Sequence, residues 1–270
     1  MNLKLKNKRA LVTGSTLGIG RAIANSLLAE GADVIINSRS QSKVKKTIDE
    51  MKITNKTDSP KITGIGADLS NHTGVNDLIS FAQSEGQIDV LINNVGSFTV
   101  KDFFDIEDSD WCHIFELNVM SAVRLSRAFL PSMLKQGWGR IIFIGSDQSS
   151  KPNPSMAHYA MTKTALVSIA RSLSELTRGT EITINSVQVA PTWTEGVSEF
   201  IEDLARIEGK TPEAMSTSYF EEGEGNTSLI QRWAEPEEIA KVVTFLSSPI
   251  SSAINGSSLR ADGGMIRSLF

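Results

Sequence analysis

The chain has 270 residues, of which 40% are hydrophobic, and a formal net charge of -4. This length and composition suit one large α/β domain whose sheet is buried on both faces. The acidic balance gives no reason to expect nucleic acid or an anionic membrane as a partner. The basic N-terminus is followed by too short an apolar stretch for a signal peptide, and no other run approaches the length of a membrane span. A cytoplasmic protein is therefore expected.

Metal-binding residue types are scarce in this chain. Cys112 is the only cysteine, and the histidines are His72, His113 and His158, with no HxxxH pair among them. A single cysteine excludes both an intrachain disulfide and a cysteine zinc cluster. No metal site is expected.

Strand-like apolar runs alternate with helix-like stretches along most of the chain. The predicted strands cover residues 10–13, 34–37, 62–66, 90–93, 141–145, 182–189 and 258–261. The predicted helices cover residues 19–30, 42–54, 72–84, 110–135, 157–178 and 236–247. Strands joined by single helices imply right-handed crossovers and a parallel sheet. The pattern predicts a doubly wound, Rossmann-like α/β fold in one domain over residues 1–270, with seven mainly parallel strands and helices on both faces.

The first predicted strand leads into Gly14-Ser15-Thr16-Leu17-Gly18-Ile19-Gly20, which opens the first helix. In a dinucleotide site, Gly14 permits the tight turn, Gly18 lets the backbone approach a pyrophosphate, and Gly20 lets the helix pack on the strand. The helix N-terminus adds free N–H groups and a partial positive charge. No Gly-Lys-Ser/Thr follows, which disfavours a nucleoside-triphosphate loop. A purely structural glycine turn is the alternative.

The residues after the second predicted strand bear on the choice of cofactor. Enzymes that prefer NAD usually have an acidic side chain here, which binds the ribose 2′-hydroxyl. This chain has Ser38 and then Arg39. A guanidinium can pair with a 2′-phosphate, and no carboxylate is present to repel it. The sequence therefore favours NADP(H), with NAD(H) as the second choice; an ordinary exposed loop cation is the alternative interpretation of Arg39.

Ser146 follows the fifth predicted strand, and Tyr159 and Lys163 occupy positions i and i+4 of the next helix. These positions share one helix face, so the Lys163 ammonium is expected to lie beside the Tyr159 phenol and to lower its pKa. Such a pair can move a proton on and off a carbonyl oxygen, while the Ser146 hydroxyl binds the same oxygen. Taken singly, each residue also fits a structural role: a turn cap, a core aromatic and a solvated cation.

One connection is far longer than the few residues that usually join elements. Residues 193–232 form an acidic insertion between a strand and a helix. Ligands of open α/β sheets bind outside the carboxyl ends of the strands, so we expect this insertion to be a helical lid over the substrate. A solvated surface insertion is the alternative. Candidate pocket residues, for several of which core packing is an equal explanation, are Asp147, Gln148, Phe200, Tyr219, Phe220 and Trp233.

With these residues in view, the chain resembles the short-chain dehydrogenase/reductase family over nearly its full length. The matching positions are Thr13-Gly14-x-x-x-Gly18-Ile19-Gly20, Asn93-Asn94-Val95-Gly96, Asn118, Ser146, Tyr159 and Lys163. The family usually has Asn-Asn-Ala-Gly where Val95 stands, and Pro-Gly where Val189-Ala190 stand.

The resemblance implies a catalytic set of Asn118, Ser146, Tyr159 and Lys163, in which Asn118 holds a water on the Lys163 side of a proton relay. It implies that Asn93 braces the sheet and that Thr194 contacts the nicotinamide carboxamide. The implied cofactor contacts are residues 14–20, Ser38, Arg39, Asp68, Leu69, Asn94, Val95, Gly96, Tyr159, Lys163, Thr192 and Thr194.

The sequence therefore predicts an NAD(P)-dependent oxidoreductase that interconverts a carbonyl and an alcohol by hydride transfer, with Tyr159 as acid/base and a small molecule as substrate. An NADP-binding redox sensor and a non-catalytic interaction scaffold are the alternatives. The acidic insertion argues against highly anionic substrates. The resemblance also implies a homo-oligomer, tetramer or dimer, built on the helices at 110–135 and 157–178.

Overall fold

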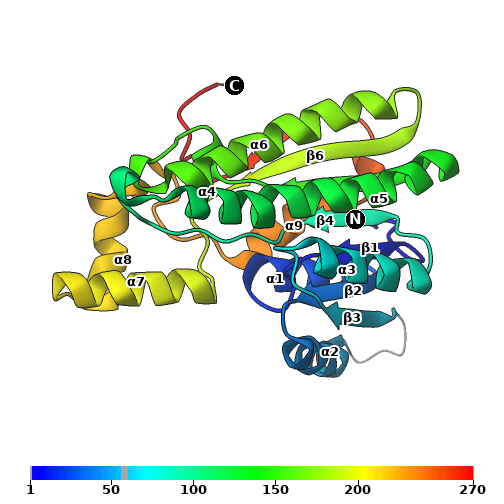
Figure 1. Ribbon diagram of the computed structural model, residues 1–270, viewed down its shortest axis with the longest axis horizontal. Coiled ribbons are helices and arrows are strands. Elements are labelled where there is room, and N and C mark those ends of the chain that lie inside the picture. Colours follow the sequence, from blue (N-terminus) through cyan, green and yellow to red (C-terminus); the bar gives the residue numbers. More distant parts are fainter. Residues whose placement is uncertain (1, 56–59, 270) are drawn as a thin grey trace.

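The computed structural model describes residues 2–55 and 60–269, so residues 1, 56–59 and 270 of the predicted domain lie outside the described part. Within that part, seven strands form one parallel sheet in the order β3-β2-β1-β4-β5-β6-β7 (Figure 1). The strands are β1 (Arg9–Val12), β2 (Asp33–Ser38), β3 (Ile62–Gly66), β4 (Val90–Asn93), β5 (Trp138–Ile144), β6 (Glu181–Val189) and β7 (Ser258–Ala261). The predicted Rossmann-like, doubly wound fold is confirmed.

Side chains along each strand point alternately to the two faces of the sheet, and helices cover both faces. In β1, Ala10 and Val12 pack into one hydrophobic cluster and Leu11 packs into the other. Residues of α1 (Gly18–Ala29), α2 (Gln41–Asn55) and α9 (Pro236–Leu246) belong to the first cluster. Residues of α3 (His72–Glu85), α5 (Ser121–Gln136) and α6 (Ala157–Ser174) belong to the second. The two layers of helices enclose the sheet.

β5 begins at Trp138, earlier than the apolar pattern predicts, because the strand contains a buried arginine. Arg140 is 1% exposed. Its guanidinium donates to the carbonyl oxygens of Gly139 at 2.8 Å, Glu181 at 2.6 Å and Ser248 at 3.2 Å. Carbonyl oxygens thus stabilise the cation inside the protein, although burial still lowers the pKa of Arg140 to about 10.

The single helix predicted over residues 110–135 is interrupted in the structure. α4 (Asp108–Phe115) and α5 are joined by a π-helical segment, Glu116–Met120. In this segment the Ser121 N–H donates to the Glu116 carbonyl, one residue further back than in an α-helix. Asn118 lies in the middle of the segment and is buried. Helical periodicity in the sequence cannot reveal such a one-residue insertion.

The insertion at 193–232 contains two helices, α7 (Glu195–Glu208) and α8 (Pro212–Glu221). They lie beyond the end of the sheet at which β6 terminates (Figure 1). Each begins at a threonine whose hydroxyl accepts a backbone N–H, Thr194 from Val197 and Thr211 from Ala214. The insertion is therefore ordered helical structure at the carboxyl edge of the sheet.

No helix within residues 2–55 and 60–269 is long and apolar enough to cross a bilayer. Over the same residues, no group of three or more histidine, cysteine, aspartate or glutamate side chains is arranged to hold a metal ion.

Candidate active site

The glycine turn after β1 is closely packed. Gly18 has a φ of +51°, in the left-handed region that favours glycine. A Cβ at Gly20 would collide with the Gly14 carbonyl oxygen and the Asn94 side chain. α1 starts at this turn without a side-chain cap and without an acidic residue in its first turn. Its N-terminal N–H groups therefore present a positive end suited to an anion.

Gly20→Ala is expected to lower the free energy of unfolding by roughly 1–3 kcal/mol, the usual cost of overpacking. Urea unfolding followed by circular dichroism measures this change. Gly196→Ala in α7 is the matched control, since a Cβ there meets no described atom within 4 Å. It is expected to leave stability unchanged or slightly higher. Equal stability of the two variants would contradict the close packing of α1 on the turn.

One N–H of the turn already binds an anionic oxygen. The Gly18 N–H donates to Glu195 Oε2 at 3.0 Å. Glu195 is the first residue of α7, and the neighbouring Thr194 also packs on Gly18. The insertion thus contacts the glycine turn, and the carboxylate demonstrates that this N–H group suits an oxyanion.

The predicted adenosine contacts lie in the loops after β2 and β3, at the carboxyl edge of the sheet. Arg39 is exposed, and Ser38 Oγ accepts the Ser40 N–H at 3.2 Å. The Ser70 N–H holds the pKa of Asp68 below its usual range, and the charge of Arg39 acts in the same direction. Leu69, 1% exposed, belongs to the core. The loop after β2 therefore carries the positive charge of Arg39 at its surface.

The segment after β4 connects the turn to the catalytic side. Asn94 Nδ2 donates to the carbonyl oxygens of Thr13 at 2.8 Å and Gly14 at 3.1 Å. The Val95 N–H donates to Thr13 Oγ1 at 2.9 Å. A Cβ at Gly96 would lie 3.3 Å from Asn118 Oδ1 and 3.6 Å from Lys163 Nζ. The Asn-Asn-Val-Gly motif therefore packs between the two predicted parts of the site.

A cavity of about 430 Å³ lies at the carboxyl ends of the central strands. It brings together most of the residues that the sequence predicts for chemistry and for the nicotinamide end of the cofactor. The predicted residues in its wall include Ile19, Asn94, Gly96, Ser146, Tyr159, Lys163, Thr192 and Thr194. α7 and α8 contribute Phe200 and Tyr219. The cavity is thus enclosed by the sheet edge and the insertion together.

Tyr159 and Lys163 lie on one face of α6, with Lys163 Nζ 5.5 Å from the centre of the Tyr159 ring. Lys163 Nζ also donates to the Ile144 carbonyl at 2.9 Å. Burial raises the pKa of Tyr159 to about 12, although the Ser146 hydroxyl acts in the opposite direction. Burial lowers the pKa of Lys163 to about 8.

The expectation that the Tyr159 pKa is lowered is therefore wrong for this structure, because loss of solvent is the largest effect and the Asp147 charge raises the pKa further. A phenol with a raised pKa stays protonated at neutral pH. This is the form that can give a proton to a carbonyl oxygen.

The Ser146 hydroxyl is hydrogen-bonded to the two residues that follow it, while the Ser146 N–H donates to Gln188 Oε1 at 3.0 Å. Its hydroxyl donates to Asp147 Oδ1 at 2.9 Å and accepts the Gln148 N–H at 3.2 Å. Asp147 is 5% exposed, and burial raises the pKa of its carboxyl to about 6. Both Asp147 and Gln148 line the cavity. Asp147 therefore places a carboxyl group in the cavity wall beside Ser146.

Asn118 lies behind the cavity wall. Its Nδ2 donates to the Ser97 carbonyl at 3.0 Å and to Thr162 Oγ1 at 3.1 Å, and its Oδ1 accepts the Ser97 N–H at 2.9 Å. The side chain thereby ties the π-helical segment to α6 and to the segment after β4. Asn93, predicted to brace the sheet, donates to Ser126 Oγ at 3.2 Å in α5.

The Val189-Ala190 departure lies where β6 ends and the next loop begins, and both residues line the cavity. Thr192 is buried, and its hydroxyl donates to the Ala190 carbonyl at 2.8 Å. Thr194 accepts the Val197 N–H at 3.3 Å. Both threonines thus line the cavity. The Thr192 hydroxyl is bound to its own loop, and the Thr194 hydroxyl caps α7.

Several wall residues were missed by the sequence analysis. Phe98 lies 6.1 Å from the Tyr159 ring and 6.0 Å from the Phe200 ring, between centroids. It belongs to an irregular segment without apolar periodicity, so no pattern singles it out. Phe220, a candidate wall residue, does not line the cavity; it is buried, with its ring centroid 5.1 Å from those of Tyr219 and Trp233.

The chain is similar to known proteins over its full length. Residues 8–205 match the model of the short chain dehydrogenase family. The uncharacterized oxidoreductase YvrD of Bacillus subtilis is 48% identical over 269 residues, covering 100% of both chains. The 3-oxoacyl-[acyl-carrier-protein] reductase FabG of Salmonella typhimurium is 32% identical over 97% of this chain and 99% of its own.

Among solved structures, the L-sorbose reductase of Gluconobacter frateurii, complexed with NADPH and L-sorbose, superposes with a TM-score of 0.92 at 28% identity. The superposition covers 100% of each chain. The sequence motifs, the strand order of the sheet and these similar proteins all indicate the same family. The protein belongs to the short-chain dehydrogenase family.

Proposed function

We propose that this protein is an NADP(H)-dependent oxidoreductase that interconverts a carbonyl and an alcohol, with Ser146, Tyr159 and Lys163 at its reacting centre. The observation that carries the proposal is the cavity in which these three side chains meet, next to the glycine turn. The similar L-sorbose reductase and FabG are both named reductases. The comparisons give no support to a redox sensor or an interaction scaffold. Consumption of NADPH in the presence of carbonyl compounds tests the proposal.

The residues present fit a dinucleotide. The start of α1 suits a pyrophosphate, since its Gly18 N–H already donates to a carboxylate oxygen, while Arg39 suits a 2′-phosphate. We assign the remaining contacts to the predicted set, from Asp68 and Leu69 at one end to Thr192 and Thr194 at the other. The reduced nicotinamide supplies the hydride when bound. NAD(H) is the second cofactor in this proposal.

The chain's own residues supply the proton and hold the substrate. Tyr159, kept protonated by burial, gives its phenolic proton to the substrate oxygen during reduction and takes it back during oxidation. Ser146 donates its hydroxyl hydrogen to the same oxygen in place of Asp147 Oδ1. Lys163 holds the strand end at Ile144 and supplies positive charge beside the phenol. Asn118 fixes α6 relative to the segment after β4 and holds a water on the Lys163 side.

Glu195 is expected to oppose cofactor binding, because its carboxylate occupies a Gly18 N–H and repels a pyrophosphate. Glu195→Ala should tighten NADPH binding roughly threefold, the usual size of an exposed charge effect at a helix end. Fluorescence titration with NADPH measures the dissociation constant.

Glu199→Ala is the control for this experiment. Glu199 lies on the same helix and lines the same surface groove, with the same charge and similar exposure. Its removal should change NADPH affinity less than the removal of Glu195. An unchanged affinity in Glu195→Ala, or an equal gain in both variants, would contradict competition for the Gly18 N–H.

We propose that residues 193–232 act as the substrate lid of the single domain. Phe200, Tyr219 and Glu224 from this insertion line the cavity, and Glu195 attaches it to the glycine turn. A lid that contacts both substrate and cofactor regions can close over the reacting atoms and exclude water.

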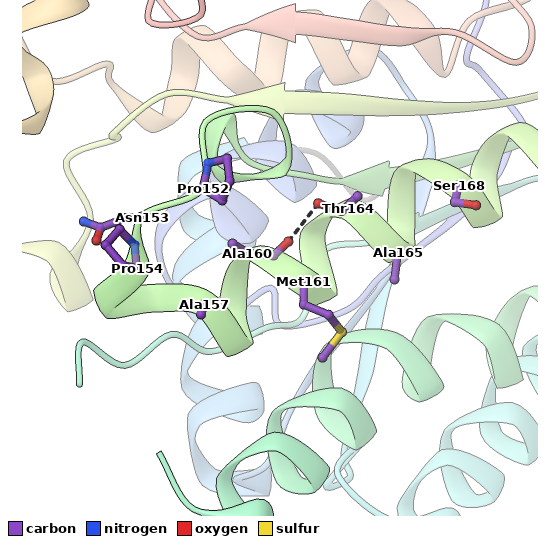
Figure 2. Close-up of a pocket in the computed structure, with 9 residues that line it drawn as sticks. All are labelled: Pro152, Asn153, Pro154, Ala157, Ala160, Met161, Thr164, Ala165 and Ser168. Carbon is purple, nitrogen blue, oxygen red and sulfur yellow. Dashed lines mark hydrogen bonds between the residues drawn. The ribbon is translucent and has the colours of Figure 1, made fainter. Parts of the chain in front are cut away.

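We also propose a cytoplasmic homo-oligomer, tetramer or dimer, that associates through α5 and α6. A shallow hollow of about 580 Å³ along α6 supports the proposal that subunits associate through this face (Figure 2). Small side chains lower the helix surface here, so that a second helix can approach closely. Figure 2 shows the lining residues Pro152, Asn153, Pro154, Ala157, Ala160, Met161, Thr164, Ala165 and Ser168, with the Thr164 hydroxyl donating to the Ala160 carbonyl.

A further inference from the structure

Two carboxyl groups line the substrate end of the cavity. Asp147 comes from the loop after β5, and Glu224 comes from the insertion beyond α8. Their charges act on each other and on Tyr219, whose pKa is raised first by burial and further by both carboxylates. The loop after β5 and the insertion therefore each place one carboxyl group at the same part of the cavity.

The nearby cation, Lys151, offsets these charges only in part. Its ammonium donates to the Glu224 main-chain carbonyl at 2.8 Å and to the Thr227 hydroxyl at 3.0 Å. Both of these acceptors are neutral. Its field lowers the pKa of Asp147 and Glu224, but burial acts more strongly and raises both. Asp147 and Glu224 are thus the two acids of this part of the wall, while the Lys151 ammonium is hydrogen-bonded to neutral oxygens and not to either carboxylate.

The rest of this part of the wall is aromatic and aliphatic. Tyr219 stacks on Trp233 with ring centroids 4.6 Å apart and planes inclined by 21°. Phe98 and Phe200 form the side near Tyr159. Flat apolar walls with a few converging acceptors are typical of pockets that orient a small polar molecule through directed hydrogen bonds.

We propose that the substrate is a neutral carbonyl compound with hydroxyl groups next to the reacting carbonyl, and that Asp147 and Glu224 select it. This inference rests on the proposed function. When Ser146 turns its hydroxyl hydrogen from Asp147 Oδ1 to the substrate carbonyl, the Asp147 carboxylate is left free to accept a hydrogen bond from a substrate hydroxyl. The same two carboxylates repel a substrate that carries a carboxylate or phosphate.

A neutral polyhydroxy compound fits better than an amine. Lys151 already places an ammonium beside both acids. A second ammonium would lose its hydration close to this cation, whereas a hydroxyl loses little and still donates a charge-assisted hydrogen bond.

Four ketones with the same four-carbon chain distinguish a hydroxylated substrate from the other classes. Erythrulose carries hydroxyl groups, butanone is unsubstituted, acetoacetate is anionic and aminobutanone is cationic. With NADPH, kcat/KM for erythrulose is expected to exceed that for each of the others by about 100-fold, because carboxylates left without a hydroxyl partner penalise the plain analogue. NADPH consumption measures all four.

Asp147→Asn and Glu224→Gln test the two acids separately. Each is expected to lower kcat/KM for erythrulose about tenfold and to raise that for acetoacetate about tenfold, as expected for a lost charged acceptor. Glu221→Gln is the matched control: Glu221 is an exposed acid at the end of α8. It should leave both values within about twofold, as do surface charges in general.

The pH dependence of the substrate preference distinguishes direct recognition by Asp147 from a purely structural role of this residue. The pKa of Asp147 is raised to about 6, in contact with Ser146 and within the fields of Lys151, Glu224, Tyr159 and Tyr219. As the pH falls through this value, Asp147 becomes neutral and stops repelling anions. The ratio of kcat/KM for acetoacetate to that for erythrulose should therefore rise in the wild type and rise less in Asp147→Asn, where Glu224 is the remaining acid of the pair.

The outcomes distinguish this inference from the proposed function. If no substrate in the panel is reduced, the proposed function fails. If carbonyl compounds are reduced but butanone, acetoacetate or aminobutanone equals erythrulose, the reductase assignment survives and the selection by Asp147 and Glu224 is overturned. An unchanged substrate ratio in both acid variants overturns it as well.

Discussion

Replacing Tyr159 with phenylalanine is expected to lower kcat for carbonyl reduction by about a thousandfold, within the usual range for loss of a general acid. The change removes one hydroxyl from a buried ring and leaves the shape of the cavity intact. NADPH affinity should stay within about threefold, because the glycine turn and Arg39 are untouched. Stopped-flow turnover together with NADPH titration measures both quantities on the same variant.

Tyr219→Phe is the natural comparison, because Tyr159 and Tyr219 are the two tyrosines of the chain and both line the cavity. Loss of the Tyr219 hydroxyl removes no reacting proton, so kcat should change by less than about tenfold. If Tyr159→Phe retained wild-type kcat, or if both variants lost activity equally, Tyr159 could not be the proton donor.

Replacing Arg39 with alanine is expected to lower kcat/KM for NADPH by roughly 10- to 100-fold, which corresponds to the loss of a charge-assisted hydrogen bond. The kcat/KM for NADH should stay within about threefold, because NADH has no 2′-phosphate to pair with the guanidinium. Arg39 is exposed after β2, and its charge reaches Asp68. Steady-state kinetics with the two cofactors in parallel gives the ratio.

Arg178→Ala controls for a general loss of positive charge. Arg178 is an exposed arginine just before β6, at the amino end of the strands and so at the opposite edge of the sheet. It should leave the NADPH to NADH ratio unchanged. An equal loss with both cofactors in Arg39→Ala would show that Arg39 does not recognise the 2′-phosphate.

The fold was predictable because its determinants are local. Three strands, β3, β4 and β7, begin and end where the apolar runs predict. The two main deviations have physical causes that lie outside hydrophobic periodicity. Arg140 is stabilised in the core by carbonyl oxygens from distant segments. The π-helical segment inserts a residue into an otherwise regular helix.

The candidate site was predictable where motif residues fix their own positions, as with the glycine turn and the Tyr159–Lys163 pair. It was not predictable where the partners come from the insertion. The contact of Glu195 with Gly18 and the approach of Glu224 to Asp147 depend on how α7 and α8 fold back over the sheet edge. The Tyr159 pKa was expected in the wrong direction, because burial is a tertiary property that the spacing does not contain.

The most direct test of the account is to follow cofactor oxidation and alcohol formation together, with purified protein, a carbonyl panel, and NADPH and NADH in parallel. We predict that one molecule of NADPH is consumed for each molecule of alcohol formed, and that NADPH is used faster than NADH. NADPH binding without any consumption across the panel would contradict the assignment of Ser146, Tyr159 and Lys163 as a working reductase centre.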